Sequence, residues 1–202
     1  DEEHLLASKK LLEERMARMN PPEADSNGQE LLDVPLTKEI PQARAGSPET
    51  YFGASRNQNF GNGERGRVGV QELVTPEKEL TRNTLYLGGL WNIQPEYAEN
   101  TEAGGVIEFS YKAKDVYFVA SSEKGVQAKL YVDGALLKGK GATVLECREK
   151  GWCGGDDVSI DGTVFIKEDR LYKLIQHEKA EQHVLKIEVE SPGLKAFTFT
   201  FG

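Results

Sequence analysis

Apolar and polar residues alternate with a period of two along several segments of the chain. The pattern occupies residues 107–111, 126–132 and 185–189, where every second side chain is apolar. Side chains of a strand point alternately to the two faces of a sheet, so each segment is predicted to be a strand with one buried face. Residues 115–120 are more uniformly apolar, which is typical of a central strand.

The last nine residues follow the same pattern. Phe197, Phe199 and Phe201 occupy alternate positions there. In an extended strand these three rings would share one face. We therefore expect the C-terminal strand to close a hydrophobic core with all three rings.

Turn signals separate the predicted strands. Asp-Gly pairs stand at residues 133–134 and 161–162, and a Pro-Gly pair stands at residues 192–193. Two more apolar segments, residues 163–167 and 171–176, lie between these turns. No helical pattern interrupts the strands from about residue 49 onward, so we predict an all-β domain, an antiparallel sandwich or barrel over residues 49–202.

The N-terminal part has a different pattern. Over residues 1–20 leucines and methionines form a helical stripe, with charged residues largely opposite, and Pro21 and Pro22 end it. An amphipathic helix of this length is marginal alone in water, so it must dock on this chain or on a domain that is missing. Residues 21–48 hold five of the eight prolines and are predicted to be a linker.

Composition and charge narrow the range of partners. The formal net charge of -8 argues against nucleic acid, because phosphate binding needs a basic surface. The chain contains no apolar run of about 18 residues, so we predict no membrane span. It shows no signal peptide and begins with Asp1, so we expect a mature product or an excised piece of a longer protein.

Cys147 and Cys153 are the two cysteines of the chain. Five residues separate them, too many for a thioredoxin-type active site, and two cysteines supply too few ligands for a structural zinc site. The simplest interpretation is a disulfide that pins a hairpin loop outside the cytoplasm. Two unpaired thiols remain an alternative, as does a redox-active pair, which Arg148 and Lys150 would favour by stabilising a thiolate.

Two polar motifs are interpreted as loops and turns. Residues 61–66 spell Gly-x-Gly-x-x-Gly, but the preceding segment is polar and the following residues 68–74 resemble a strand rather than a helix. Asp156, Asp157 and Asp161 could supply oxygens to calcium, yet their spacing does not match an EF-hand, so we interpret them as turn residues.

Sugar binding would use exposed rings that stack on pyranose faces. The candidates by residue type are Tyr51, Trp91, Tyr97 and Trp152. Trp91 lies in an apolar segment, where core packing is the simpler role. Trp152, flanked by glycine and the cysteine loop, is the ring that we expect to be most exposed.

The sequence contains no convincing catalytic constellation. His4, His177 and His183 are scattered, and His183 is expected to be a partly buried, hydrogen-bonded residue of a strand. Gly-x-Ser-x-Gly and His-Glu-x-x-His motifs are absent. We therefore predict a non-catalytic protein with no cofactor and no metal.

Seven short segments, in order along the chain, resemble a known family. They are ETYFG at residues 49–53, LGGLW at 87–91, AKDV at 113–116, VDG at 132–134, GDDV at 155–158, RLYKLI at 170–175 and FTFG at 199–202. Together with Arg56 and Phe60 they are similar to the C-terminal domain of DipZ-type proteins, which are thioredoxin-like proteins linked to thiol-disulfide exchange and cytochrome c biogenesis. The matches extend over about three quarters of the chain.

The resemblance implies a jelly-roll-like β-sandwich, similar to a carbohydrate-binding module, that follows a thioredoxin domain on the extracytoplasmic side. It further implies that residues 1–20 are the last helix of that upstream thioredoxin domain. The thioredoxin Cys-x-x-Cys is absent, so the family's redox activity does not carry over. We expect an accessory module that binds a glycan or a protein substrate. The alternatives are a free-standing lectin-like domain and an oxidoreductase that uses Cys147 and Cys153.

Overall fold

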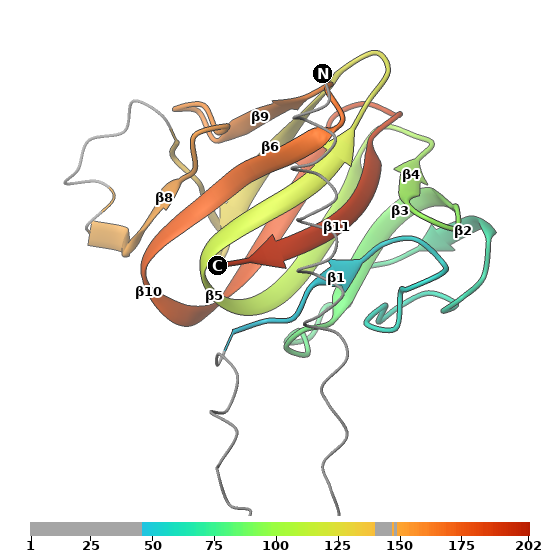
Figure 1. Cartoon of the computed structure of the whole chain (residues 1–202), viewed down its shortest axis with the longest axis horizontal. Helices are drawn as coiled ribbons and strands as arrows, with labels where there is room; N and C mark the ends of the chain where they lie inside the picture. The colour runs from blue at the N-terminus through green and yellow to red at the C-terminus, as the bar shows by residue number, and fades with distance from the viewer. Residues whose placement is uncertain (1–45, 140–146, 148) are drawn as a thin grey trace, which may run out of the picture. The chain divides into compact units, whose positions relative to one another are not determined.

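The computed structural model describes residues 46–139, 147 and 149–202 (Figure 1). Nearly all regular structure in this part of the chain is β-strand, joined into one sheet network of eleven strands. The predicted helix over residues 1–20 and all but the last three residues of the predicted linker, 21–48, lie outside the described residues.

The strands range from two to twenty residues. In chain order they are β1 (Thr50–Tyr51), β2 (Gly69–Leu73), β3 (Leu85–Ile93), β4 (Ala98–Asn100), β5 (Gly105–Ser121), β6 (Val126–Val132), β7 (Ala135–Leu136), β8 (Trp152–Gly154), β9 (Thr163–Ile166), β10 (Arg170–Val189) and β11 (Lys195–Phe201).

Two long antiparallel strands, β5 and β10, organise the sheet. They pair from Gly105 opposite Val189 to Ala120 opposite Arg170. The other edge of β5 is taken first by β3 and then by β11, and the other edge of β10 by β8 and β6. Figure 1 shows both strands curving strongly, so that the sheet folds over on itself. The described residues form an antiparallel, jelly-roll-like β-sandwich, which confirms the predicted fold class.

Each long strand contains two of the predicted strands. Residues 107–111 and 115–120 are the two halves of β5, and residues 171–176 and 185–189 belong to β10. The prediction treated these halves as separate strands. In the structure the buried face changes phase between them, from Ala113 to Val116 in β5 and at Leu174 and Ile175 in β10. The structure keeps the chain extended through each phase change and bends it instead.

The bend in β5 is held by the C-terminal residue. The backbone amides of Lys114 and Asp115 both donate to the carbonyl oxygen of Gly202, at 2.9 and 3.1 Å, and the Gly202 amide donates back to Asp115 at 3.0 Å. On β10 the adjacent Leu174 and Ile175 are both fully buried, and the register shifts between Lys173 and Ile175. A bulge of this kind bends a strand and increases its twist.

The core between the layers is built around Phe199 of β11. Its ring centroid lies 4.9 Å from that of Phe118, 5.3 Å from that of Phe52 and 5.8 Å from that of Phe109. Phe201 stacks on Phe109 at 5.5 Å. Tilted and offset pairs at these separations are favourable beyond the apolar area that they bury.

Phe197 does not join these rings, so the prediction of three phenylalanines in one core is wrong for this residue. The register of β11 against β5 shifts between Ala196 and Thr198, and Phe197 is the extra residue. Its ring instead contacts Tyr97 at a centroid distance of 5.4 Å. The period-two pattern did not reveal this, because one inserted residue moves the later side chains to the opposite face.

We expect Phe199→Ala to lower the free energy of unfolding by about 3–5 kcal/mol, because it leaves a cavity among three rings. Urea denaturation followed by circular dichroism measures the change. The matched control is Phe165→Ala on β9, whose side chain is 56% exposed; it should cost about 1 kcal/mol or less. Equal losses for the two variants would contradict this account of the core.

Candidate functional site

Trp91 is a core residue and is not available as a sugar-stacking ring. Its side chain is fully buried in β3, and Nε1 donates to the carbonyl oxygen of Gly88 at 2.9 Å. Burial with the indole N–H satisfied is the usual state of a core tryptophan. The candidate site residue Trp91 is therefore corrected to a structural one.

Tyr51 and Tyr97 are half-buried and already have neighbours on their rings. The guanidinium of Arg56 lies 3.8 Å from the ring centroid of Tyr51, and the Tyr51 hydroxyl donates to Glu49. The ring of Tyr97 contacts Phe197, and the ammonium of Lys195 lies 5.7 Å from its centroid. Both tyrosines keep part of their surface open to solvent.

Trp152 of β8 lies apart from the two tyrosines and is half-buried. Figure 1 shows β8 at one side of the fold and β3 and β4 at the other. The edge of the indole meets His183 at 5.2 Å and His177 at 6.2 Å between centroids. The structure therefore does not bring the four predicted rings together on one surface.

Cys147 and Cys153 are joined by a disulfide, with their Cα atoms 5.1 Å apart. Cys153 lies in β8, where it pairs with Gln176 of β10. The amide of Gly151 donates to the carbonyl oxygen of Cys147 at 2.9 Å and closes the turn between the two cysteines. The pair thus cross-links a short turn at an edge of the sheet.

Beneath Trp152 lies a polar cluster that joins β5, β10 and the turn after β6. The hydroxyl of Tyr111 and Nε2 of His177 share a hydrogen bond of 2.7 Å. The rings of His177 and His183 stack at 4.3 Å with 8° between their planes, and Nδ1 of His183 bonds to Asp133 at 2.7 Å. The expectation of a hydrogen-bonded, partly buried His183 is confirmed.

A bulge in β10 places His177 in this cluster. Gln176 pairs with Asp115 and Glu181 pairs with Ala113, so residues 177–180 stand opposite Lys114 alone. The extra residues turn His177 inward, where it is 2% exposed. Its Nδ1 atom is buried and has no hydrogen-bond partner in the described part of the chain.

Burial determines the protonation states of His177 and Tyr111 in this cluster. Desolvation, followed by the neighbouring His183, lowers the pKa of His177 to about 4. Desolvation also raises the pKa of Tyr111 well above its ordinary value, with the charge of Asp133 acting in the same direction. At neutral pH His177 and Tyr111 are therefore both uncharged.

A pocket of about 410 Å³ opens beside Trp152, and we call it the tryptophan pocket. Both cysteines of the disulfide line it, and so does the buried His177. Its lining residues are Lys114, Cys147, Trp152, Cys153, Gln176, His177 and Glu178.

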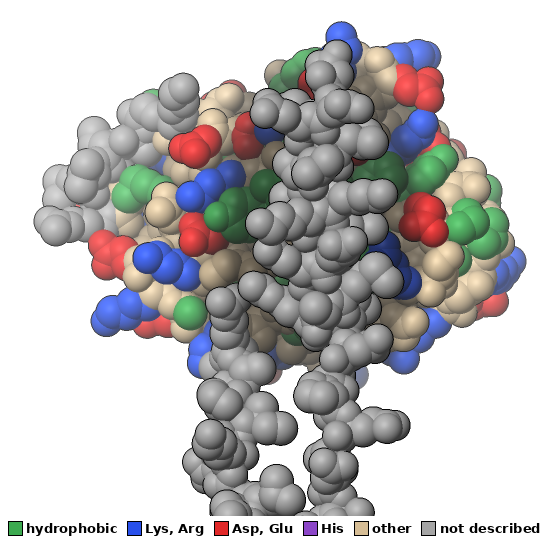
Figure 2. Space-filling model, in the orientation of Figure 1, with side chains coloured by type: hydrophobic (Ala, Val, Ile, Leu, Met, Phe, Trp, Pro, Cys, Tyr) green, Lys and Arg blue, Asp and Glu red, His purple; other side chains and the backbone are tan. Residues whose placement is uncertain are grey.

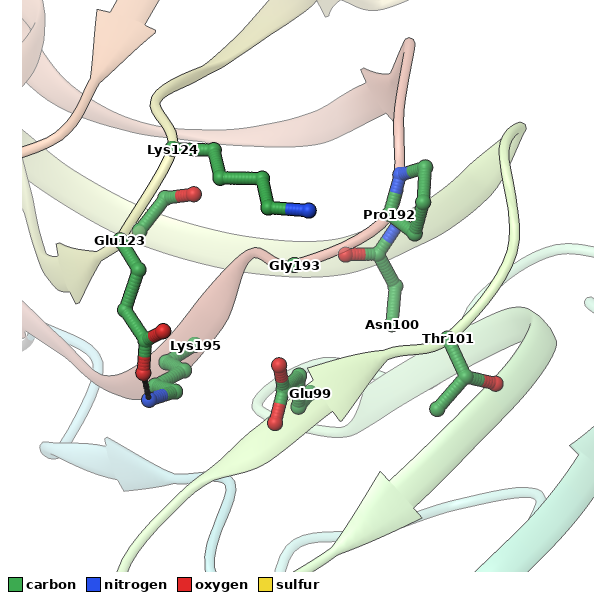
Figure 3. A pocket seen from close by; sticks show the side chains of 9 residues that line it. Glu99, Asn100, Thr101, Glu123, Lys124, Pro192, Gly193 and Lys195 are labelled. Atoms are coloured by element: carbon green, nitrogen blue, oxygen red, sulfur yellow. Dashed lines mark hydrogen bonds and ion pairs between the residues drawn. The ribbon is translucent and has the colours of Figure 1, made fainter.

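A second pocket, of about 320 Å³, lies where three turns meet at the ends of β4, β5 and β10, and we call it the loop-end pocket (Figure 3). It is lined by polar and charged residues more than by apolar ones. These are Glu99, Asn100, Thr101, Ser122, Glu123, Lys124, Pro192, Gly193 and Lys195.

Asn100 fixes the floor of the loop-end pocket. Its Nδ2 donates to the carbonyl oxygens of Glu102 and Ser191, both at 2.9 Å, and its Oδ1 accepts from the amide of Leu194 at 2.8 Å. The side chain is buried, so these bonds tie the turn after β4 to the turn before β11. The side-chain amide of Asn100 bonds only to backbone groups here, so Asn100 is a positioning residue that holds the turns of the pocket in place.

The side chains of Glu99, Lys124 and Ser122 remain available to a ligand in this pocket. Lys195 is paired with Glu123 at 2.8 Å, but Glu99 and Lys124 have no ion-pair partner among the described residues. Figure 3 shows Lys124 reaching across the pocket and the carboxylate of Glu99 facing the same space. Ser122 is 3% exposed, and its buried hydroxyl has no hydrogen-bond partner among the described residues.

Sequence reasoning missed the loop-end pocket. Its residues come from three separate turns, and a turn signal such as Pro192-Gly193 does not say which other turns lie beside it. The sequence analysis identified Trp152 and the two cysteines of the tryptophan pocket as candidate residues. It did not include His177 and His183, because nothing in the sequence shows that a bulge brings these two histidines together.

The other motifs are engaged in turns. The loop over residues 61–66 leads into β2 rather than a helix. Asp157 accepts from Arg170 and from the Lys173 amide, both at 2.7 Å, and Asp161 accepts from the Thr163 hydroxyl at 2.8 Å. In the described part of the chain no group of three or more His, Cys, Asp or Glu residues could hold a metal ion.

The described surface carries both positive and negative side chains on the face shown in Figure 2. On the face in Figure 2, Lys and Arg side chains lie between Asp and Glu side chains, with hydrophobic patches among them. Within the described ranges no helix is long and apolar enough to cross a membrane.

Comparison with known proteins identifies the domain. A family model described as thioredoxin like C-terminal domain matches residues 47–202. The chain belongs to this family. Two relatives of this thioredoxin-like C-terminal domain are named protein DipZ, from Mycobacterium bovis and Mycobacterium tuberculosis, and each is 32% identical over 83 residues. The resemblance to DipZ-type proteins is thereby confirmed.

The match takes in 41% of this chain and only 12% of the length of either DipZ protein. Among solved structures, a family two carbohydrate esterase from Clostridium thermocellum in complex with cellohexaose is similar with a TM-score of 0.39 and 14% identity. That likeness covers 54% of this chain and 28% of the esterase chain, and at this level it says nothing about what the domain binds.

The depressed pKa of His177 predicts a loss of stability in acid. The unfolded chain takes up a proton near pH 6.5, whereas the folded state does so near pH 4. Protonation of His177 should therefore lower the free energy of unfolding by about 3 kcal/mol as the pH drops through this window, and this residue should contribute no further loss below it.

Urea denaturation at several pH values between 7 and 4 measures this effect. Titration of carboxylates adds to the slope of every variant, so the informative quantity is the difference between variants. His177→Gln, which keeps a polar partner for Tyr111, should have a shallower pH dependence than the wild type. The control Gln176→Ala on the same strand should keep the full slope, and an unchanged slope in His177→Gln would refute the assignment.

Proposed function

We propose that residues 47–202 are a non-catalytic binding module of an extracytoplasmic thioredoxin-like protein of the DipZ type, and that the loop-end pocket binds a sugar. The observation that carries the proposal is the buried, unpartnered Ser122 hydroxyl in a pocket that also holds Glu99 and Lys124. A buried polar group without a partner is costly, and a ligand hydroxyl would satisfy it.

The chemistry of the pocket suits a polyhydroxyl ligand. Each sugar hydroxyl is both a donor and an acceptor, and the pocket offers a carboxylate acceptor in Glu99, an ammonium donor in Lys124 and the hydroxyls of Thr101 and Ser122. Its volume of about 320 Å³ lies at the lower end of the range for small-molecule sites. Tyr97 stands next to it across Lys195.

The same pocket lacks the features of a hydrolytic site. A serine nucleophile needs a general base within hydrogen-bond reach, and the Ser122 hydroxyl has no hydrogen-bond partner within the described ranges. Glu123 is engaged by Lys195, which lowers the pKa of this carboxyl through their hydrogen bond. These contacts favour a role in binding over one in catalysis.

The family supports the wider setting of the proposal. A module that follows a thioredoxin domain can hold that domain close to a glycan, or to a glycan-bearing protein, in the cell envelope. The Cys147–Cys153 disulfide is compatible with an oxidising compartment. The Cys-x-x-Cys dithiol of the parent, and any role in cytochrome c biogenesis, would belong to residues outside this module.

Titration with mono- and disaccharides, followed by backbone amide NMR, tests the proposal. We expect millimolar sugar to shift the amides of the three turns around the loop-end pocket. Lys124→Ala should weaken binding about tenfold through loss of a charged hydrogen bond, and Ser122→Ala should weaken it less. The matched control is Lys179→Ala, an exposed lysine of β10 that does not line this pocket.

No response to any sugar at millimolar concentration would overturn the sugar assignment. So would a response to short peptides with free termini in its place, because Glu99 and Lys124 could also pair with an ammonium and a carboxylate. Shifts confined to residues around Trp152 would show that the site is misplaced.

A further inference from the structure

The disulfide lines two surface pockets. Cys147 and Cys153 both line the tryptophan pocket, of about 410 Å³, and Cys147 and Trp152 also line a neighbouring pocket of about 230 Å³. Both cysteines are only partly buried. Exposed disulfides are the ones that are reduced readily, whereas structural ones resist reduction.

The backbone around the disulfide is held without it. Trp152 pairs with His177 in the sheet, and the amide of Glu178 donates to the carbonyl oxygen of Gly151 at 3.2 Å. The Trp152 ring rests on the stacked histidines. These contacts do not pass through the sulfur atoms, so the disulfide can open while β8 stays on β10.

The contribution of the cross-link to stability is also modest. The two cysteines are six residues apart, and closing so short a loop stabilises a protein by about 2 kcal/mol. A domain of ordinary stability, about 5–15 kcal/mol, remains folded after such a loss. Reduction under native conditions is therefore compatible with the fold.

Lysines lie near the disulfide. Lys114 lines the tryptophan pocket together with Glu178, and Lys150 lines the neighbouring pocket together with Glu149. A nearby positive charge stabilises a thiolate, which is the leaving group when a disulfide is cleaved.

We propose that Cys147–Cys153 exchanges with the Cys-x-x-Cys dithiol of a thioredoxin-like domain, which docks over Trp152 and reduces it. The partner domain is the one that the proposed function assigns to the parent protein, so the inference rests on that part of it. The sugar site is separate and is not needed for the exchange.

The exchange balances in two steps. A thiolate of the partner attacks one sulfur of Cys147–Cys153, the S–S bond breaks, a mixed disulfide forms, and the other cysteine leaves as a thiolate and takes up a proton. The second thiol of the partner loses its proton and attacks the mixed disulfide, which releases the first cysteine. Two electrons and two protons pass to Cys147 and Cys153, and the partner becomes a disulfide.

The test mixes the oxidised full chain with a reduced Cys-x-x-Cys thioredoxin and counts free thiols by alkylation and mass spectrometry. We expect reduction without denaturant, about tenfold or more faster than by glutathione at the same thiol concentration. A thioredoxin whose second cysteine is replaced by serine should accumulate a mixed disulfide with Cys147 or Cys153. Circular dichroism of the reduced chain should remain that of the folded domain.

Variants distinguish docking of the thioredoxin from simple exposure of the disulfide to small thiols. Trp152→Ala should slow reduction by thioredoxin but not by dithiothreitol, and Phe165→Ala on β9 should change neither rate. If Trp152→Ala does not fold, Lys150→Glu offers the same comparison through charge. A disulfide that resists thioredoxin until urea unfolds the chain, or a domain that unfolds on reduction, would overturn the inference. Failure of sugar binding with normal exchange would remove only the sugar assignment.

Discussion

The pairing of β5 with β10 is the interaction on which the rest of this domain depends. These two strands run antiparallel along nearly their whole lengths, and each bends where its buried face changes phase. The bend is held by backbone hydrogen bonds from Lys114 and Asp115 to Gly202. It lets one continuous sheet supply both layers of the sandwich, with the rings around Phe199 between them. Gly202 is part of the architecture, because its backbone pairs with that of β5 at the bend.

Both pockets follow from the path of β10. Its bulge opposite Lys114 turns His177 under Trp152 and opens the tryptophan pocket beside the disulfide. The far end of the same strand leads into the turn that Asn100 ties down, and that turn forms one wall of the loop-end pocket. A bulge and a strand end are both places where the regular ladder stops, so side chains there are free to take roles other than packing.

The sequence patterns predicted strands correctly where buried and exposed side chains alternate regularly. The alternation in residues 126–132 corresponds to β6, and the Asp-Gly turn at residues 133–134 follows it directly. Patterns were unreliable where the chain gains one residue against its neighbour. Phe197 of β11 leaves the core for this reason. The extra residues 177–180 of β10 opposite Lys114 likewise lie where the prediction divided β10, and β5 opposite it, into separate strands. A register shift depends on the partner strand, which a single strand's residues do not specify.

The all-β class, the family and the closeness of the two cysteines can be inferred from residue order alone, because each depends on local patterns or on motifs along the chain. The folded structure is needed to see that Trp91 is a core residue and that Trp152 lies over two stacked histidines. It is also needed to see that Ser122, Glu99 and Lys124 line the same pocket. These groupings arise from sheet pairing between residues far apart in the chain, and distance along the chain carries no information about which turns meet at the end of a folded sheet.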